Sequence, residues 1–125
     1  MQWKFSGGQP VYVQIMEQLK TAVLAGEFPP GGRIPPVREL AFQAQVNPNT
    51  MQRALMELER EGLLEARGAL GRFVTDDPVI LDAMRGKALE AVIRNCASQC
   101  KAVGLTMQQA AQMLLALEQK EEDHG

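Results

Sequence analysis

A mainly α-helical fold with one small β-hairpin is predicted for the 125-residue sequence by three observations. Apolar residues recur every three or four positions in several segments, which is the period of an amphipathic helix. Proline or a capping residue precedes most of these segments, and glycine follows them. One stretch, "LLEARGALGRFVT", instead alternates in character around a glycine-bearing turn, as a β-hairpin does.

Composition places the chain among ordinary globular proteins. It is 46% hydrophobic and 22% charged, and no apolar run is long enough to span a bilayer. The N-terminus, "MQWKFSGGQP", lacks the basic and apolar regions of a secretion signal, and two cysteines do not suggest a disulfide framework. We therefore expect a cytoplasmic protein with no membrane segment.

The net charge of −2 is unevenly distributed. Residues 1–75 hold eight basic and seven acidic residues, a net +1, whereas residues 76–125 hold five and eight, a net −3. The chain is therefore not a uniformly basic nucleic-acid coat, and any nucleic-acid binding has to come from a local patch.

The N-terminal half predicts four elements before the hairpin. Trp3 and Phe5 alternate as in a short strand, which is expected to join the hairpin sheet. A first helix is predicted from Pro10 to Gly26 and a second over residues 36–44, followed by a tight turn.

A third helix begins where Asn47 is a favoured N-cap and Pro48 a favoured first residue, and it ends at Gly62. Its predicted buried residues are Met51, Ala54, Leu55 and Leu58. Helix, helix, turn, helix, hairpin is the order of a winged helix-turn-helix, so residues 1–75 are predicted to form that domain.

Residues 76–125 are predicted to form a helical dimerisation segment. Asp77 and Pro78 begin one helix, Gly104 ends it, and Thr106 with Gln109 forms a capping box for the last helix. Two amphipathic helices cannot bury both apolar faces in a chain of this size, so a homodimer is expected. The residues predicted to form its interface are Leu81, Met84, Ala88, Val92, Cys96, Cys100, Leu114 and Leu117.

The outer face of the third helix suggests what the domain binds. Asn49, Gln52 and Arg53 lie opposite or beside the apolar stripe, and no carboxylate occurs before Glu57. Amide side chains can pair with adenine and arginine with guanine in the major groove, and a helix N-terminus attracts phosphate. The alternative is a solvated polar face with no partner.

The stretch "RIPPVRELAFQAQVNPNTMQRALMELEREGLL", with "PVYVQI" before it and "GRFV" after it, resembles the GntR family of bacterial transcription regulators over residues 10–75. The resemblance implies that Arg38 contacts a phosphate or a base from the second helix. It implies that Asn47 and Thr50 hold the third helix on the DNA backbone. The residues that it implies face base edges are Asn49, Gln52 and Arg53.

For the wing, the resemblance implies that Arg67, Gly68 and Arg72 approach the minor groove or its phosphates. The sequence departs from the family pattern in two places. Pro48 stands where many members carry arginine, and Gly68 and Gly71 are separated by two residues where members often have one. The wing contact therefore cannot be assigned to a single residue.

The short C-terminal segment is similar to that of the YtrA-type subfamily, whose two helices are associated with dimerisation. Two helices cannot enclose a typical metabolite pocket, so no effector is assigned. We expect a homodimeric, sequence-specific DNA-binding regulator, a repressor, that binds double-stranded DNA at an inverted-repeat operator.

Two other functions stay open. The winged helix can bind protein instead of DNA, or Cys96 and Cys100 can form a redox switch instead of packing in a dimer core. No nucleophile–base set, metal-ligand spacing or phosphate loop is visible, and the one histidine, His124, lies beside the C-terminus. Neither an enzyme nor a cofactor or metal site is predicted.

Overall fold

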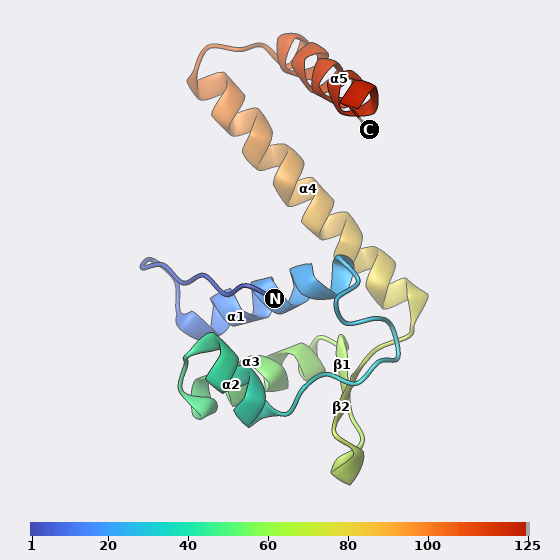
Figure 1. Cartoon of the computed structure of the whole chain (residues 1–125). Helices are drawn as coiled ribbons and strands as arrows, with labels where there is room; N and C mark the ends of the chain where they lie inside the picture. The colour runs from blue at the N-terminus through green and yellow to red at the C-terminus, as the bar shows by residue number, and fades with distance from the viewer. Residues whose placement is uncertain (125) are drawn as a thin grey trace. The chain divides into compact units, whose positions relative to one another are not determined.

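The computed structural model describes residues 1–124, with only the backbone of His124, and divides the chain into two units, Met1–Arg85 and Gly86–Gly125. The first contains α1 (Val11–Leu24), α2 (Val37–Ala44), α3 (Pro48–Arg60), β1 (Leu64–Ala66) and β2 (Arg72–Val74) (Figure 1). Helix α4 (Pro78–Ala102) continues from the first unit into the second, which also holds α5 (Met107–His124). The fold is the predicted one, mainly helical with a two-stranded wing.

The predicted start of α3 is confirmed. The Asn47 side-chain oxygen accepts a hydrogen bond from the Asn49 backbone N–H at 2.8 Å, and Pro48 is the first helical residue. The tight turn before it depends on Gln45, which ends α2 with φ 56° in the left-handed region that usually requires glycine.

The core of the winged unit lies where α3 packs against α1 and α2. All four apolar residues predicted on the inner face of α3 are at most 1% exposed. The large side chains buried almost completely are Ile15, Leu40, Met51, Leu55, Leu58 and Val74. Burying each such side chain stabilises the fold by about 1.5–3 kcal/mol, so this cluster fixes how α3 is presented.

The wing is an antiparallel hairpin in which Leu64 pairs with Val74 and Ala66 with Arg72, with a short 3-10 turn over Gly68–Leu70 at its tip. A third segment flanks β2. The Val74 N–H donates to the Gly32 carbonyl at 2.8 Å, and the Ile34 N–H donates to the Arg72 carbonyl at 3.0 Å. The loop before α2 thus occupies the free edge of the hairpin.

The prediction that the N-terminal residues form a strand of this sheet is wrong. Residues 1–6 belong to no strand, and they lie along α1. Gln18 exchanges two hydrogen bonds with the Lys4 backbone, at 3.0 and 2.6 Å, and Gln14 exchanges two with Ser6, at 2.9 and 2.8 Å. Amide side chains one helical turn apart therefore satisfy the backbone that a strand neighbour would have satisfied.

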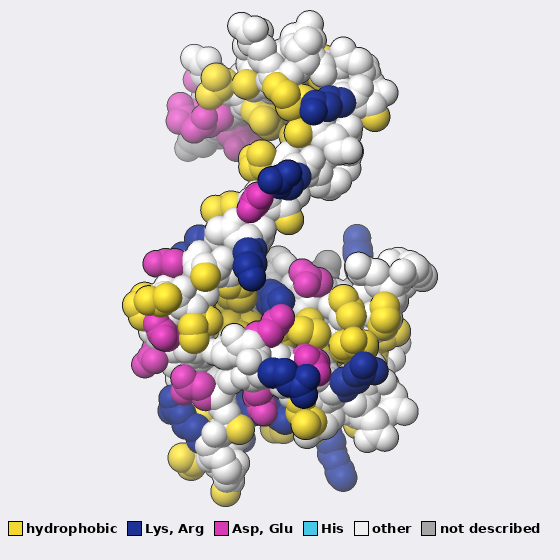
Figure 2. Space-filling model, turned by 180° about the vertical axis from the view of Figure 1, so that it is seen from behind, with side chains coloured by type: hydrophobic (Ala, Val, Ile, Leu, Met, Phe, Trp, Pro, Cys, Tyr) yellow, Lys and Arg dark blue, Asp and Glu magenta, His cyan; other side chains and the backbone are white. Residues whose placement is uncertain are grey.

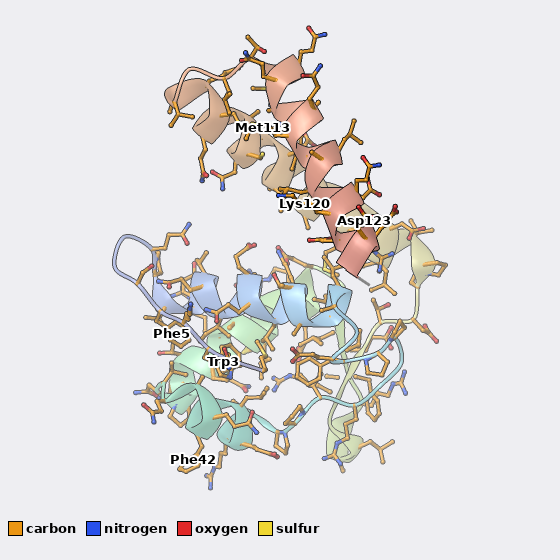
Figure 3. The ribbon with its side chains drawn as sticks, turned by 45° about the horizontal axis from the view of Figure 1, so that its top comes forward. Trp3, Phe5, Phe42, Met113, Lys120 and Asp123 are labelled. Atoms are coloured by element: carbon orange, nitrogen blue, oxygen red, sulfur yellow. The ribbon has the colours of Figure 1, made fainter. Side chains whose placement is uncertain are left out.

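Trp3 and Phe5 lie on that N-terminal segment with their rings stacked, their centroids 6.1 Å apart (Figure 3). Trp3 packs against the core. The alternation that suggested a strand therefore serves to anchor the segment.

In the C-terminal half the predicted caps are confirmed. The Asp77 carboxylate accepts from the Val79 N–H at 2.9 Å, and Thr106 and Gln109 form the reciprocal capping box at 2.9 and 3.1 Å. The unit boundary falls inside α4, after Arg85, whereas the sequence placed the domain boundary at Thr75. None of the described helices is long and apolar enough to cross a membrane.

Two predicted interface residues, Leu81 and Met84, precede that boundary. Both are half-buried and pack against the core of the winged unit. The first turns of α4 therefore close the winged unit, and apolar surface available to a partner begins further along the helix.

Candidate nucleic-acid interface

Helix α3 presents a polar, acid-free N-terminal turn. Asn47 and Asn49 are exposed, Thr50 and Gln52 are half-buried, and no acidic residue occurs in the first turn. The first carboxylate, that of Glu57, pairs with Arg60 at 3.1 Å. Pro48 has no N–H and the Asn49 N–H is used by the Asn47 cap, so this end of the helix offers the positive end of the helix dipole and exposed amide side chains. It therefore suits an anionic partner that carries hydrogen-bonding edges.

Arg53 is exposed, and its guanidinium carbon lies 3.8 Å from the centre of the Tyr12 ring. This cation–π contact joins α3 to the first turn of α1. Arg53 was predicted from the sequence to lie on the base-facing surface, but its contact with the Tyr12 ring was not predicted. Because Tyr12 is half-buried against the core, it gives the guanidinium a fixed support.

Arg38 is an exposed residue in the first turn of α2. It borders an open hollow of about 530 Å³ over the α2–α3 turn, together with Phe42, Gln45 and Pro48. Phe42, which the sequence analysis did not single out, is 85% exposed and lies on α2 away from the core (Figure 3). Its neighbours at helical spacing within α2, Arg38 and Glu39, are charged, which is the signal that it does not lie on the core face of the helix.

The wing holds the remaining predicted contacts in two different environments. Near the tip, the Arg67 guanidinium carbon lies 4.4 Å from the Phe73 ring centre and its Nη2 lies 3.2 Å from Glu65. Gly68 is exposed beside it. Arg72, in contrast, pairs with Glu59 of α3, and both side chains are largely buried. Arg72 therefore links the wing to α3.

Basic and acidic side chains are interspersed on the surface seen in Figure 2, so ion pairing decides which cations are available. Within the described residues, three arginines of the winged unit form no ion pair, namely Arg33, Arg38 and Arg53. Arg33 was missed by the sequence analysis because it lies in the loop before α2 and outside any helical pattern.

The two thiols lie in the second unit. Cys96 and Cys100 are free and half-buried on α4. Partial burial and the neighbouring Cys96 thiol raise the pKa of Cys100, which lowers its thiolate fraction at neutral pH. No group of three metal-ligating side chains occurs among the described residues.

This arrangement of three packed helices, an α3 whose N-terminal turn has no acidic residue, and a flanking wing agrees with a comparison against known families. The model of the bacterial regulatory proteins of the gntR family matches residues 11–74. The chain belongs to the GntR family. Members of this family are DNA-binding transcription regulators, and the winged unit is the part that the match covers.

Relatives extend the similarity beyond the winged unit. The chain is 37% identical over 106 residues to the uncharacterized HTH-type transcriptional regulator YhcF of Bacillus subtilis, covering 85% of this chain and 88% of that one. It is 43% identical over 68 residues to the HTH-type transcriptional repressor YtrA of the same organism, covering 54% and 52%. The expected resemblance to YtrA-type regulators is thus confirmed.

Solved structures agree. A GntR family regulator from Listeria monocytogenes covers 90% of this chain and 98% of its own, at a TM-score of 0.80 and 26% identity. The DNA-binding domain of AraR, solved in complex with operator ORX1, covers 60% and 96% at a TM-score of 0.56 and 29% identity.

Proposed function

We propose that the chain is a homodimeric, sequence-specific repressor that binds an inverted-repeat operator through α3 and the wing. The observation that carries this proposal is the surface formed by the acid-free N-terminal turn of α3 and the ion-pair-free Arg38 and Arg53. Amide side chains on α3 supply donors and acceptors for base edges, and the arginines supply charge for phosphate or guanine. The operator complex of AraR and the repressor YtrA support the assignment by similarity.

The expected roles of the site residues follow from their surroundings. Asn47 holds the start of α3 through its cap. Asn49 and Gln52 read base edges from the first turns of the helix. Thr50 and Arg38 contact the DNA backbone. At the wing, Arg67 and Gly68 approach the minor groove. Arg72, which pairs with Glu59, acts by holding the wing against α3.

The dimer is supported by the second unit, whose helices carry apolar side chains without partners. Val92, Leu114 and Leu117 are 65%, 51% and 57% exposed. Hydrophobic side chains gather on the surface of this unit in Figure 2. Exposed apolar stripes of this kind mark an interface, and a symmetric partner matches an inverted-repeat operator.

Phe42 is the observation that favours the alternative of a protein-binding winged helix, because an exposed aromatic side chain can anchor a protein partner. A redox sensor is less well supported, since the raised pKa of Cys100 disfavours the reactive thiolate. Cys96 and Cys100 are then structural residues of the dimer segment.

The test is to select duplexes from a random-sequence library with the full-length protein and to titrate the selected and scrambled duplexes at several salt concentrations. We expect an inverted repeat, two chains per duplex, roughly 10³-fold or greater preference for the selected sequence, and steep salt dependence. Equal binding of both duplexes, or affinity independent of salt, would contradict the proposal. Repeating the titration with and without reductant tests the thiol alternative, and we expect no difference.

A further inference from the structure

We infer that Arg33 is a DNA-backbone contact at the base of the wing, binding a phosphodiester of the strand that runs between the grooves read by α3 and by the wing. This inference rests on the proposed function. It adds a binding residue that lies outside the helix-turn-helix pattern, and it gives the loop before α2 a direct part in binding.

The first observation is that Arg33 is held against the wing. Its backbone forms an antiparallel bridge with Phe73, and the flanking Ile34 N–H bonds the Arg72 carbonyl at 3.0 Å. The loop therefore cannot move independently of the hairpin. A cation placed here keeps a defined position relative to the wing, as a phosphate contact requires.

The second observation is the close approach of its side chain to Gly71. The Arg33 Nε atom lies only 3.0 Å from the position that a Cβ atom at residue 71 would occupy. Gly71 also has φ 100°, a conformation that other residues rarely adopt. The glycine thus leaves room for the guanidinium beside the wing, where a side chain would displace it.

The third observation is the groove that Arg33 borders. An open groove of about 350 Å³ separates the start of α2, at Pro36 and Val37, from the wing at Gly68 and Gly71. When a recognition helix enters the major groove, the preceding helix crosses the backbone. A wing that reaches the neighbouring minor groove must span the phosphate strand between the major and minor grooves of the DNA. The protein groove between α2 and the wing would lie over that strand.

Arg33 differs from Arg72, the other arginine at this groove, in having no carboxylate partner that neutralises its charge. Arg72 is 19% exposed in its side chain and is neutralised by Glu59, whereas Arg33 is exposed and pairs with no carboxylate among the described residues. A free guanidinium on an open groove suits a phosphodiester, because its planar fork can donate two parallel hydrogen bonds to phosphate oxygens.

The experiment compares full-length wild type with Arg33→Ala, Arg33→Lys and Arg60→Ala. Each is titrated with the duplex selected in the preceding experiment and with its scrambled counterpart at several salt concentrations. Arg60→Ala is the matched control, since it also removes one exposed arginine, but one that pairs with Glu57 at the end of α3. Thermal unfolding of each variant checks that its midpoint temperature agrees with that of the wild type.

We expect Arg33→Ala to weaken both duplexes by the same factor and to lower the salt slope by about one unit per subunit. Arg33→Lys should restore the slope, because it retains the charge, and Arg60→Ala should behave as wild type. A loss for Arg33→Ala no larger than that of Arg60→Ala would overturn the contact. A loss confined to the selected duplex would overturn the backbone assignment in favour of base reading. If wild type binds neither duplex, the proposed function itself fails.

Discussion

Arg53 and Tyr12 are far apart in the sequence, yet their side chains form one unit on the surface of the winged domain. The helical phase of α3 predicts that Arg53 faces outward, and it does. The phase cannot predict Tyr12 beneath it, because that contact depends on how α1 crosses α3. For an isolated exposed arginine, rotamer entropy opposes any single contact. In the proposed contact of Arg53 with DNA, the aromatic ring would reduce that cost by holding the guanidinium in place beforehand.

Removing the ring should therefore weaken binding through Arg53. We expect Tyr12→Leu to reduce affinity for the selected duplex by about 0.5–2 kcal/mol, the range of a cation–π contact, and Arg53→Ala by about 1–3 kcal/mol with relaxed preference at one operator position. Tyr12→Phe keeps the ring and is the matched control, expected to bind as wild type. Titrations of both single variants and the double variant measure the coupling.

Fully additive losses in that cycle would show that Tyr12 does not act through Arg53. If Arg53→Ala binds selected and scrambled duplexes as wild type does, the assignment of Arg53 to the DNA surface fails. The protein-binding alternative would then gain support.

Helices were predictable from the sequence because their signals are local. Period, proline and capping residues placed the starts of α3, α4 and α5, and the structure contains the expected hydrogen bonds at Asn47, Asp77 and Thr106. The conformation of the N-terminal segment was not predictable, and the strand expected there does not form. Its apparent alternation involved only Trp3 and Phe5, and the hairpin edge it would have joined is taken by residues 31–34, a non-local outcome.

The turn between α2 and α3 contains a local conflict that can be tested. Gln45 adopts φ 56°, where the strain of a residue with a Cβ atom lowers the stability of the folded state by about 1–2 kcal/mol. Glycine removes this strain, but it makes the unfolded chain more flexible and so lowers stability by about 0.4–1 kcal/mol. We expect Gln45→Gly to raise the free energy of unfolding by roughly 0.5–1 kcal/mol, measured by urea denaturation.

Gly62→Ala, after the C-terminal end of α3, is the control with the opposite expected sign. Gly62 has φ 86°, and an added Cβ atom would lie 3.3 Å from Ile80 Cδ1, so alanine should destabilise the fold by about 1 kcal/mol or more. A decrease in stability for Gln45→Gly would mean that contacts of its side chain outweigh the backbone strain.

At the scale of the whole molecule, the two parts of the chain differ in net charge, as their proposed roles require. The first 75 residues carry a net +1 and the remainder a net −3, so the helical segment is a poor polyanion ligand. Its sequence pattern predicted apolar stripes, but the structure was needed to show that Leu81 and Met84 are already used by the winged unit. The proposed interface therefore rests on residues later in α4 and in α5, such as Val92 and Leu114.

Charging α5 should separate the proposed dimer. Leu114 and Leu117 are 51% and 57% exposed, so burying the exposed half of each in both subunits would contribute about 3–6 kcal/mol, half of the figure for full burial. Micromolar association corresponds to about 8 kcal/mol, so Leu114→Asp with Leu117→Asp should give a monomer by sedimentation velocity at micromolar concentration. Gln112→Asp with Gln119→Asp adds the same charge at exposed polar positions of α5 and should remain a dimer.

The monomeric variant should lose its preference for two half-sites over one while retaining salt-dependent binding, because its winged unit is intact. A wild-type monomer at that concentration would refute the dimer, and a dimeric double-leucine variant would place the interface elsewhere than on these residues.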